Sequence, residues 1–176
     1  MSSKILSLAS PVFGKKFSPK FSEGTRVLNG EVPCLHFAGD NAKAMGIILR
    51  IIHYRVDDVP SDIDTVPLAI LAVLCDKYDC KKALGGWIET WFSSQKLHAS
   101  FSSSTPVSIG YALLAVYKFG SKHSFLSDLV SRASNFLRPD FRDKCHNHSL
   151  LKLLPEDLIC LSYLPPSIII ADTNIL

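Results

Sequence analysis

The sequence lacks the features that mark a membrane-spanning protein, a secreted protein or an enzyme of a familiar class. No apolar run approaches the ~18 residues that a membrane-spanning helix needs, because polar, charged or proline residues interrupt every hydrophobic segment. The apolar stretch after Lys4 ends at Pro11 and Lys15–Lys16, which is too short for a secretory signal peptide. No G-x-S-x-G motif, phosphate-binding loop or H-E-x-x-H motif occurs. We therefore expect neither a membrane anchor nor a catalytic residue.

The five cysteines form no C-x-x-C pair, and their odd number argues against a disulfide framework. Cys75, Cys80 and Cys160 stand among apolar residues, as buried free thiols do. This usage predicts a reduced, intracellular protein, either cytoplasmic or nuclear.

Two polar clusters contain residue types that bind metal ions, but neither has the full set of ligands at the spacing of a known metal site. Cys145-His146-Asn147-His148 has no second Cys/His pair at finger spacing, so a surface loop is predicted there. Four aspartates lie between residues 57 and 64, without the turn glycine and late glutamate of a calcium loop. A loop that begins a helix explains these acids, which are Asp57, Asp58, Asp62 and Asp64. We expect no metal and no cofactor.

What the chain does have is a globular composition, with 47% hydrophobic and 20% charged residues in 176. The net charge is +3, but residues 1–30 alone carry +4 and the remainder −1. The basic excess is therefore local to the opening stretch, which raises the alternative of nucleic-acid binding. Residues 2–24 contain no Arg, Asn or Gln to read base edges, so their lysines could contact only phosphates. A solvated helix face explains them better.

Periodicity and capping residues predict mostly helices. Two short ones open the chain, at about 3–9 and 11–17, separated by an N-cap and a proline at Ser10-Pro11. The residues expected to face inward are Ile5, Leu8 and Ala9 on the first and Val12, Phe13 and Phe17 on the second. The segment 32–37, VPCLHF, predicts a strand because Asn29-Gly30 and Gly39 bound it.

Further helices are predicted along the rest of the chain. Asp40 is the expected cap of a helix over about 41–54, with Met45, Ile48, Leu49 and Ile52 in one stripe. Asp79 is the expected cap of a helix in which Gly85-Gly86 would pack closely against a neighbour. The remaining helices are expected at about 65–76, 106–119 and 122–137, and just after Pro155.

The order of these segments carries a family resemblance. SSKILSLASPVF, FSPKFSEG, LHFAGDNAKAMGIILRIIHYRVDDVP, LAILAVLCDKYDC and WIETW follow one another over about residues 2–92. In this order they resemble the BTB/POZ domain of filamentous-fungal proteins. The resemblance implies an α+β, mostly helical fold in which a BTB/POZ-like domain is followed by a helical extension. We divide the chain into residues 1–98 as that domain, 99–105 as a linker, 106–164 as the extension and 165–176 as a tail.

The sequence departs from the family at its start. BTB/POZ domains normally begin with a β-hairpin that precedes the first helix pair, whereas Met1 lies directly before that pair here. We therefore expect a truncated domain that is marginally stable and prone to self-association, with strand 32–37 lacking its neighbours.

The resemblance implies a non-enzymatic protein–protein interaction module, used for dimerisation or as an adaptor. In BTB adaptors that recruit a cullin ubiquitin-ligase scaffold, a hydrophobic-x-Glu motif follows the first helix pair. Phe21 and Glu23 fall at that place and are the predicted partner-binding residues. The alternative is a nucleic-acid-associated transcriptional regulator that uses the basic N-terminal helix pair.

Overall fold

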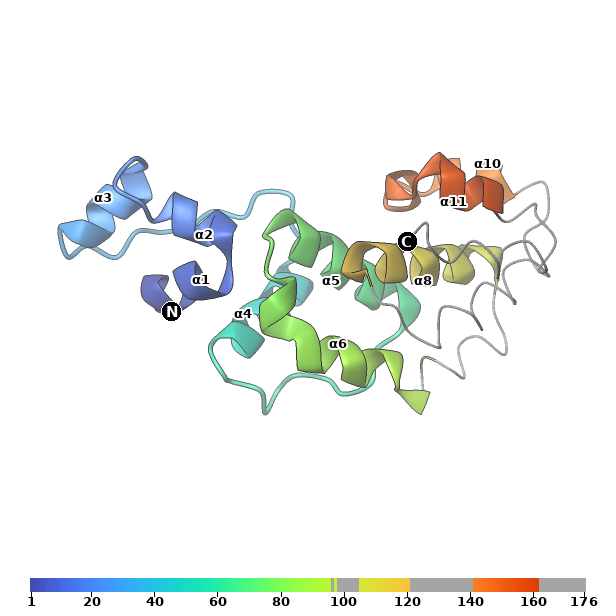
Figure 1. Cartoon of the computed structure of the whole chain (residues 1–176), viewed down its shortest axis with the longest axis horizontal. Coiled ribbons are helices and arrows are strands. Elements are labelled where there is room, and N and C mark those ends of the chain that lie inside the picture. The colour runs from blue at the N-terminus through green and yellow to red at the C-terminus, as the bar shows by residue number, and fades with distance from the viewer. Residues whose placement is uncertain (96, 98–104, 121–140, 162–176) are drawn as a thin grey trace.

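The computed structural model describes residues 1–95, 97, 105–120 and 141–161, and every regular element in these ranges is helical (Figure 1). The mostly helical part of the predicted fold class is therefore confirmed. The α-helices are α1 Ser3–Ala9, α2 Pro11–Lys16, α3 Ser22–Leu28, α4 Ala42–Ile52, α5 Thr65–Lys77, α6 Gly85–Phe92, α8 Pro106–Phe119, α10 Phe141–Asn147 and α11 Glu156–Leu161. Two 3-10 turns are η1 Lys81–Leu84 and η2 Leu151–Leu153. None of these helices is both long and apolar enough to cross a membrane.

The first two helices begin and end close to where the sequence predicts. Ser10 is the N-cap of α2, and its hydroxyl accepts a hydrogen bond from the Phe13 N–H at 3.1 Å. The inward faces are only partly as predicted, because the buried residues are Leu6 and Phe13 while Leu8 is 85% exposed. Seven residues span too few turns for periodicity to choose between neighbouring faces, so packing against the rest of the chain decides which one is buried.

The predicted strand at 32–37 is wrong: among the described residues, no strand or bridge is assigned. The segment runs as a single length of chain from α3 to α4 (Figure 1). A strand requires a neighbour that accepts and donates main-chain hydrogen bonds, and no described segment lies beside this one in that way. The α+β part of the predicted fold class is thus not found in the described chain.

The helix predicted at 41–54 is α4, and its stripe is buried, with Met45, Ile48 and Ile52 in the core. Its N-cap is Asn41, whose side chain accepts from the Ala44 N–H at 3.0 Å. The prediction of Asp40 as the cap is wrong, because this carboxylate is bound instead by Lys77, the last residue of α5, and by Tyr78, which follows it.

Helices α5 and α8 form the centre of the molecule and make its most extensive helix–helix contact (Figure 1). The bounds of both helices are close to those predicted. Thr105 is the N-cap of α8, as predicted, and its hydroxyl accepts a hydrogen bond from the Ser108 N–H at 3.3 Å. An ion pair of 2.7 Å between Lys118 and Asp76 joins their exposed sides. One hydrophobic core therefore runs from the N-terminal helices through α5 into α8.

The segment between α5 and α6 differs from the prediction. Asp79 has a φ of 46° and lies before a 3-10 turn, so it is not the cap of a continuous helix. The predicted close packing at Gly85-Gly86 is also wrong, because a Cβ at either position would meet no atom within 4 Å. The buried residues of this stretch include Leu84, Ile88 and Trp91.

The C-terminal part contains a helix where a surface loop was predicted. Cys145-His146-Asn147 belongs to α10, which begins at the buried Phe141. Gly110 of α8 leaves the space for this packing, since a Cβ there would lie 3.4 Å from the Phe141 ring and 3.2 Å from Leu151. The short helix predicted after Pro155 is α11. The predicted linker at 99–105 lies outside the described residues except for Thr105, which is the N-cap of α8. The predicted helix at 122–137 and tail at 165–176 lie wholly outside them.

Candidate partner-binding surface

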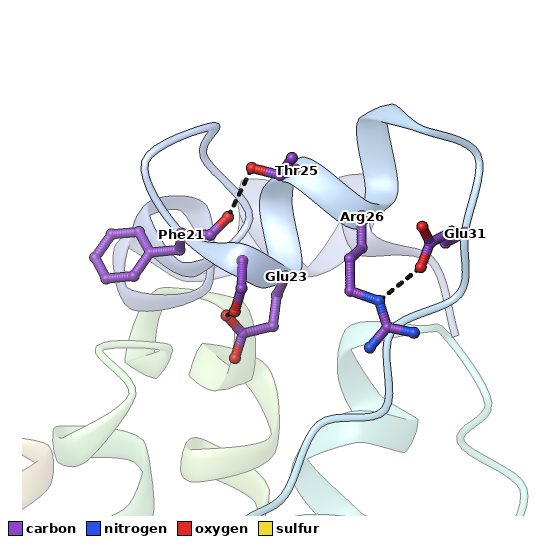
Figure 2. A network of polar contacts seen from close by, with 6 residues as sticks. Phe21, Glu23, Thr25, Arg26 and Glu31 are labelled. Carbon is purple, nitrogen blue, oxygen red and sulfur yellow. Dashed lines mark hydrogen bonds and ion pairs between the residues drawn. The ribbon is translucent and has the colours of Figure 1, made fainter.

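Phe21 and Glu23 lie at the start of α3, at one end of the molecule (Figure 1). Phe21 is the N-cap residue, and its carbonyl accepts hydrogen bonds from the Thr25 N–H at 3.0 Å and the Thr25 hydroxyl at 3.2 Å. Its side chain is 50% exposed, and Figure 2 shows the ring directed away from α3. The main chain of Phe21 is therefore fixed while its ring stays open to a partner.

The Glu23 carboxylate is held within the chain. Lys16 lies 2.8 Å from one carboxylate oxygen, and the Ser22 hydroxyl donates to the other at 3.0 Å. The hydrogen bond from Lys16 is the largest cause that lowers the pKa of Glu23, followed by main-chain and Ser22 hydrogen bonds, and the pKa falls to about 2. Glu23 also lies in the first turn of α3, where a negative charge is favoured by the helix dipole. A partner would meet this residue as an ion pair with Lys16.

Gly24 fixes α3 against the preceding turn, which the sequence analysis missed. It is buried, and a Cβ built on it would lie 2.0 Å from the Ser18 carbonyl oxygen and 2.6 Å from the Phe17 carbonyl carbon. No side chain fits at such distances from main-chain atoms. At the other end of α3, Arg26 bonds to Glu31 at 2.7 Å (Figure 2). The close approach at Gly24 and the hydrogen bond from the Phe21 N–H to the Ser18 carbonyl at 3.1 Å hold the start of α3 against the end of the helix pair.

The helix pair is in turn tied to α5 through Ser10 and aromatic rings. The buried Ser10 hydroxyl donates to the Tyr78 carbonyl while accepting from Phe13. The Phe13 ring stacks on Tyr78 with centroids 5.1 Å apart, and Phe37 meets both rings edge-on. No local sequence signal indicates these contacts, because the partners are separated by tens of residues.

Asp40 reinforces the same junction. Burial raises the pKa of Asp40, but hydrogen bonds from Lys77 and Tyr78 outweigh it together and leave the pKa below its ordinary value. Lys77 lies 2.6 Å from the carboxylate, and the Tyr78 hydroxyl donates to the second oxygen. The pKa of Tyr78 is raised, first by burial and then by the Asp40 hydrogen bond. These contacts therefore hold the C-terminal end of α5 against the segment that precedes α4.

Exposed apolar side chains gather on the N-terminal part of the molecule. More than half of the large hydrophobic residues that are exposed in the described chain fall within residues 1–32. They are Met1, Ile5, Leu8, Val12, Phe21, Leu28 and Val32. Residues 1–32 therefore expose more large apolar side chains than all the other described residues together.

The basic residues of the opening stretch are only partly available. Lys4, Lys15 and Lys20 are exposed, whereas Lys16 pairs with Glu23 and Arg26 pairs with Glu31. The charge that would face a nucleic acid is therefore smaller than the sequence suggests.

The described residues also contain two buried thiols and two surface pockets, which are the alternative candidates for a functional site. Cys75 and Cys80 are buried free thiols, as predicted, and the Cys80 hydrogen bond and then burial raise the pKa of Cys75. An open polar hollow is lined by Ser61, Asp62, Glu89, Thr90, Ser93 and Ser94. A second hollow lies between α4 and the start of α5. Within the described residues, no three His, Cys, Asp or Glu side chains are placed to share a metal ion.

No family model, curated protein or solved structure matches this chain.

Proposed function

We propose that this chain is a non-enzymatic protein–protein interaction module of the BTB/POZ kind, acting as a dimerisation or adaptor domain. The observation that carries the proposal is the open Phe21 ring on a main chain that Thr25 and Gly24 hold in place. A rigid, exposed aromatic residue is a typical interface anchor because binding buries it at little cost in main-chain order.

The resemblance to BTB adaptors extends the proposal to a cullin scaffold as partner. In this assignment Phe21 inserts into an apolar pocket of the partner, and the Lys16–Glu23 ion pair beside it fixes the register. The free thiols Cys34, Cys75 and Cys80 support an intracellular site of action.

The experiment is a pull-down of a cullin scaffold with purified chain. Phe21→Ala should weaken capture by about tenfold or more, since removing an aromatic anchor costs on the order of 2 kcal/mol. Leu153→Ala is the matched control, because Leu153 is 46% exposed and lies in η2, which follows α10 in the C-terminal part of the chain. Equal capture by the two variants would refute the role of Phe21. No capture by the unaltered chain would refute the cullin adaptor role.

The nucleic-acid alternative draws on Lys4, Lys15 and Lys20, which are exposed and form no ion pair within the part of the chain that the structure describes. Phosphate binding through a few lysines weakens steeply with salt. A salt titration of binding to a nonspecific duplex therefore separates the two functions.

A further inference from the structure

The segment between α3 and α4 has the side-chain alternation of an extended strand, although no other described segment pairs with it. Val32, Cys34 and His36 are exposed, and Val32 reaches 91%. Leu35 and Phe37 point the other way and pack against the core. Successive side chains that alternate between two sides indicate extended main chain.

One main-chain edge of this segment is already closed. In an extended chain, the N–H and C=O of every second residue point to the same edge. On the edge shared by residues 31, 33, 35 and 37, the Glu31 N–H donates to the Arg26 carbonyl at 2.9 Å. The Phe37 carbonyl accepts from the Asp40 N–H at 3.2 Å. Pro33 has no N–H to offer. This edge cannot form a regular ladder.

The opposite edge is open. It carries the N–H and C=O groups of Val32, Cys34 and His36, and none of these takes part in a hydrogen bond anywhere in the part of the chain that the structure describes. Unpaired edges of this kind are templates for another strand. Gly30 and Gly39, with φ of 79° and 78°, turn the chain at either end and limit the edge to these residues.

We propose that a second copy of this chain occupies the open edge, with the two segments antiparallel about Cys34. The edge is self-complementary: Val32 and His36 lie two residues on either side of Cys34, and each of the three residues offers one N–H and one C=O to the same edge. Cys34 then faces Cys34 of the second copy, and Val32 faces His36. Each residue exchanges both of its main-chain bonds with the residue opposite. The second copy also supplies a strand of matching length between the same two turns.

This pairing gives the proposed interaction module a specific partner and rests on that function only in being a protein–protein contact. Phe21 and Glu23 lie outside the paired edge. If the chain dimerises but does not capture a cullin scaffold, only the adaptor role is refuted. If it captures the scaffold but does not dimerise through this edge, only the strand pairing is refuted.

The first test is the oligomeric state of the full chain by sedimentation equilibrium under reducing conditions. A short strand pair buries less than a standard interface, so we expect a dimer that is populated by about 100 µM protein. A chain that remains wholly monomeric at that concentration overturns the proposal.

The second test uses Cys34 as a probe of register. Residues that face each other in a hydrogen-bonded antiparallel pair have Cα atoms about 5.5 Å apart, which a disulfide spans. Copper phenanthroline with oxygen takes the two electrons and two protons of the thiol pair. We expect the disulfide-linked Cys34 peptide of two copies in nonreduced digests. A dimer in which Cys34 is not cross-linked to itself overturns the proposed register.

Two matched pairs of variants test the edge itself. Cys34→Pro and His36→Pro remove an N–H from the open edge, whereas Cys34→Ser and His36→Ala keep it. Because these side chains are exposed, the core is unaffected, and far-UV circular dichroism verifies folding. Each proline variant should raise the dimer dissociation constant at least ~10-fold over its matched control. Proline variants that dimerise as tightly as their controls overturn the proposal.

Discussion

Ser10→Ala should destabilise the chain far more than an ordinary N-cap substitution, because Ser10 makes two buried hydrogen bonds. Its hydroxyl accepts from the Phe13 N–H at 3.1 Å and donates to the Tyr78 carbonyl. Loss of the cap costs about 1 kcal/mol. The Tyr78 carbonyl loses its partner as well, which costs a further ~1–3 kcal/mol when water cannot replace it. The free energy of unfolding should therefore fall by roughly 2–4 kcal/mol.

The assay is urea unfolding followed by far-UV circular dichroism, with Ser2→Ala as the matched control. Ser2 is the N-cap of α1, and its hydroxyl accepts from the Ile5 N–H at 3.4 Å in an exposed position. This variant should lose no more than about 1 kcal/mol. If Ser10→Ala and Ser2→Ala differ by less than about 0.5 kcal/mol, the Tyr78 bond contributes little. The hydrogen bond from Ser10 to the Tyr78 carbonyl would then contribute little to holding the helix pair against the end of α5.

Three further predictions concern α3 and the basic stretch. Gly24→Ala should displace α3, since the new Cβ would lie 2.0 Å from the Ser18 carbonyl oxygen, and hydrogen exchange of α3 amides should rise. Because folding lowers the pKa of Glu23 from 4.5 to about 2, the ion pair with Lys16 stabilises α3 above pH 4.5 and is lost as the pH falls toward 2. An NMR titration of the Glu23 side chain should show that midpoint. Binding to a nonspecific DNA duplex should be negligible at 150 mM salt.

Each of these has a control within the same chain. Gly46→Ala places a methyl group in α4 where no atom lies within 4 Å, so it should be neutral or stabilising by about 0.5–1 kcal/mol. Equal exchange rates in the two alanine variants would contradict the close approach at Gly24. Lys16→Met should return the Glu23 midpoint toward 4.5, and an unchanged midpoint would exclude Lys16 as its cause. Tight duplex binding at 150 mM salt would favour the nucleic-acid function.

Much of the helical framework follows from local sequence. Ser10-Pro11 and Thr105-Pro106 each combine a capping side chain with a proline at the first helical position, and α2 and α8 begin there. The periodic stripe of α4 is likewise buried as predicted. Caps, proline and 3.6-residue periodicity act within one or two turns, so a linear sequence displays them in full.

Pairing between distant segments is what the sequence left open. Leu35 and Phe37 of the predicted strand pack against the core, but a strand exists only if a second segment bonds to it, and none does within the described residues. Likewise, the role of Gly24 depends on the path of residues 17–18, and that of Ser10 on the position of Tyr78. The sequence alone indicated most of the helices and where several of them begin, but it did not predict α3 and it predicted a loop where α10 lies. Only the tertiary structure decided which faces are buried and that Lys16 holds Glu23. It also decided that one edge of the extended segment has no main-chain partner among the described residues, because each of these features depends on residues brought together across the fold.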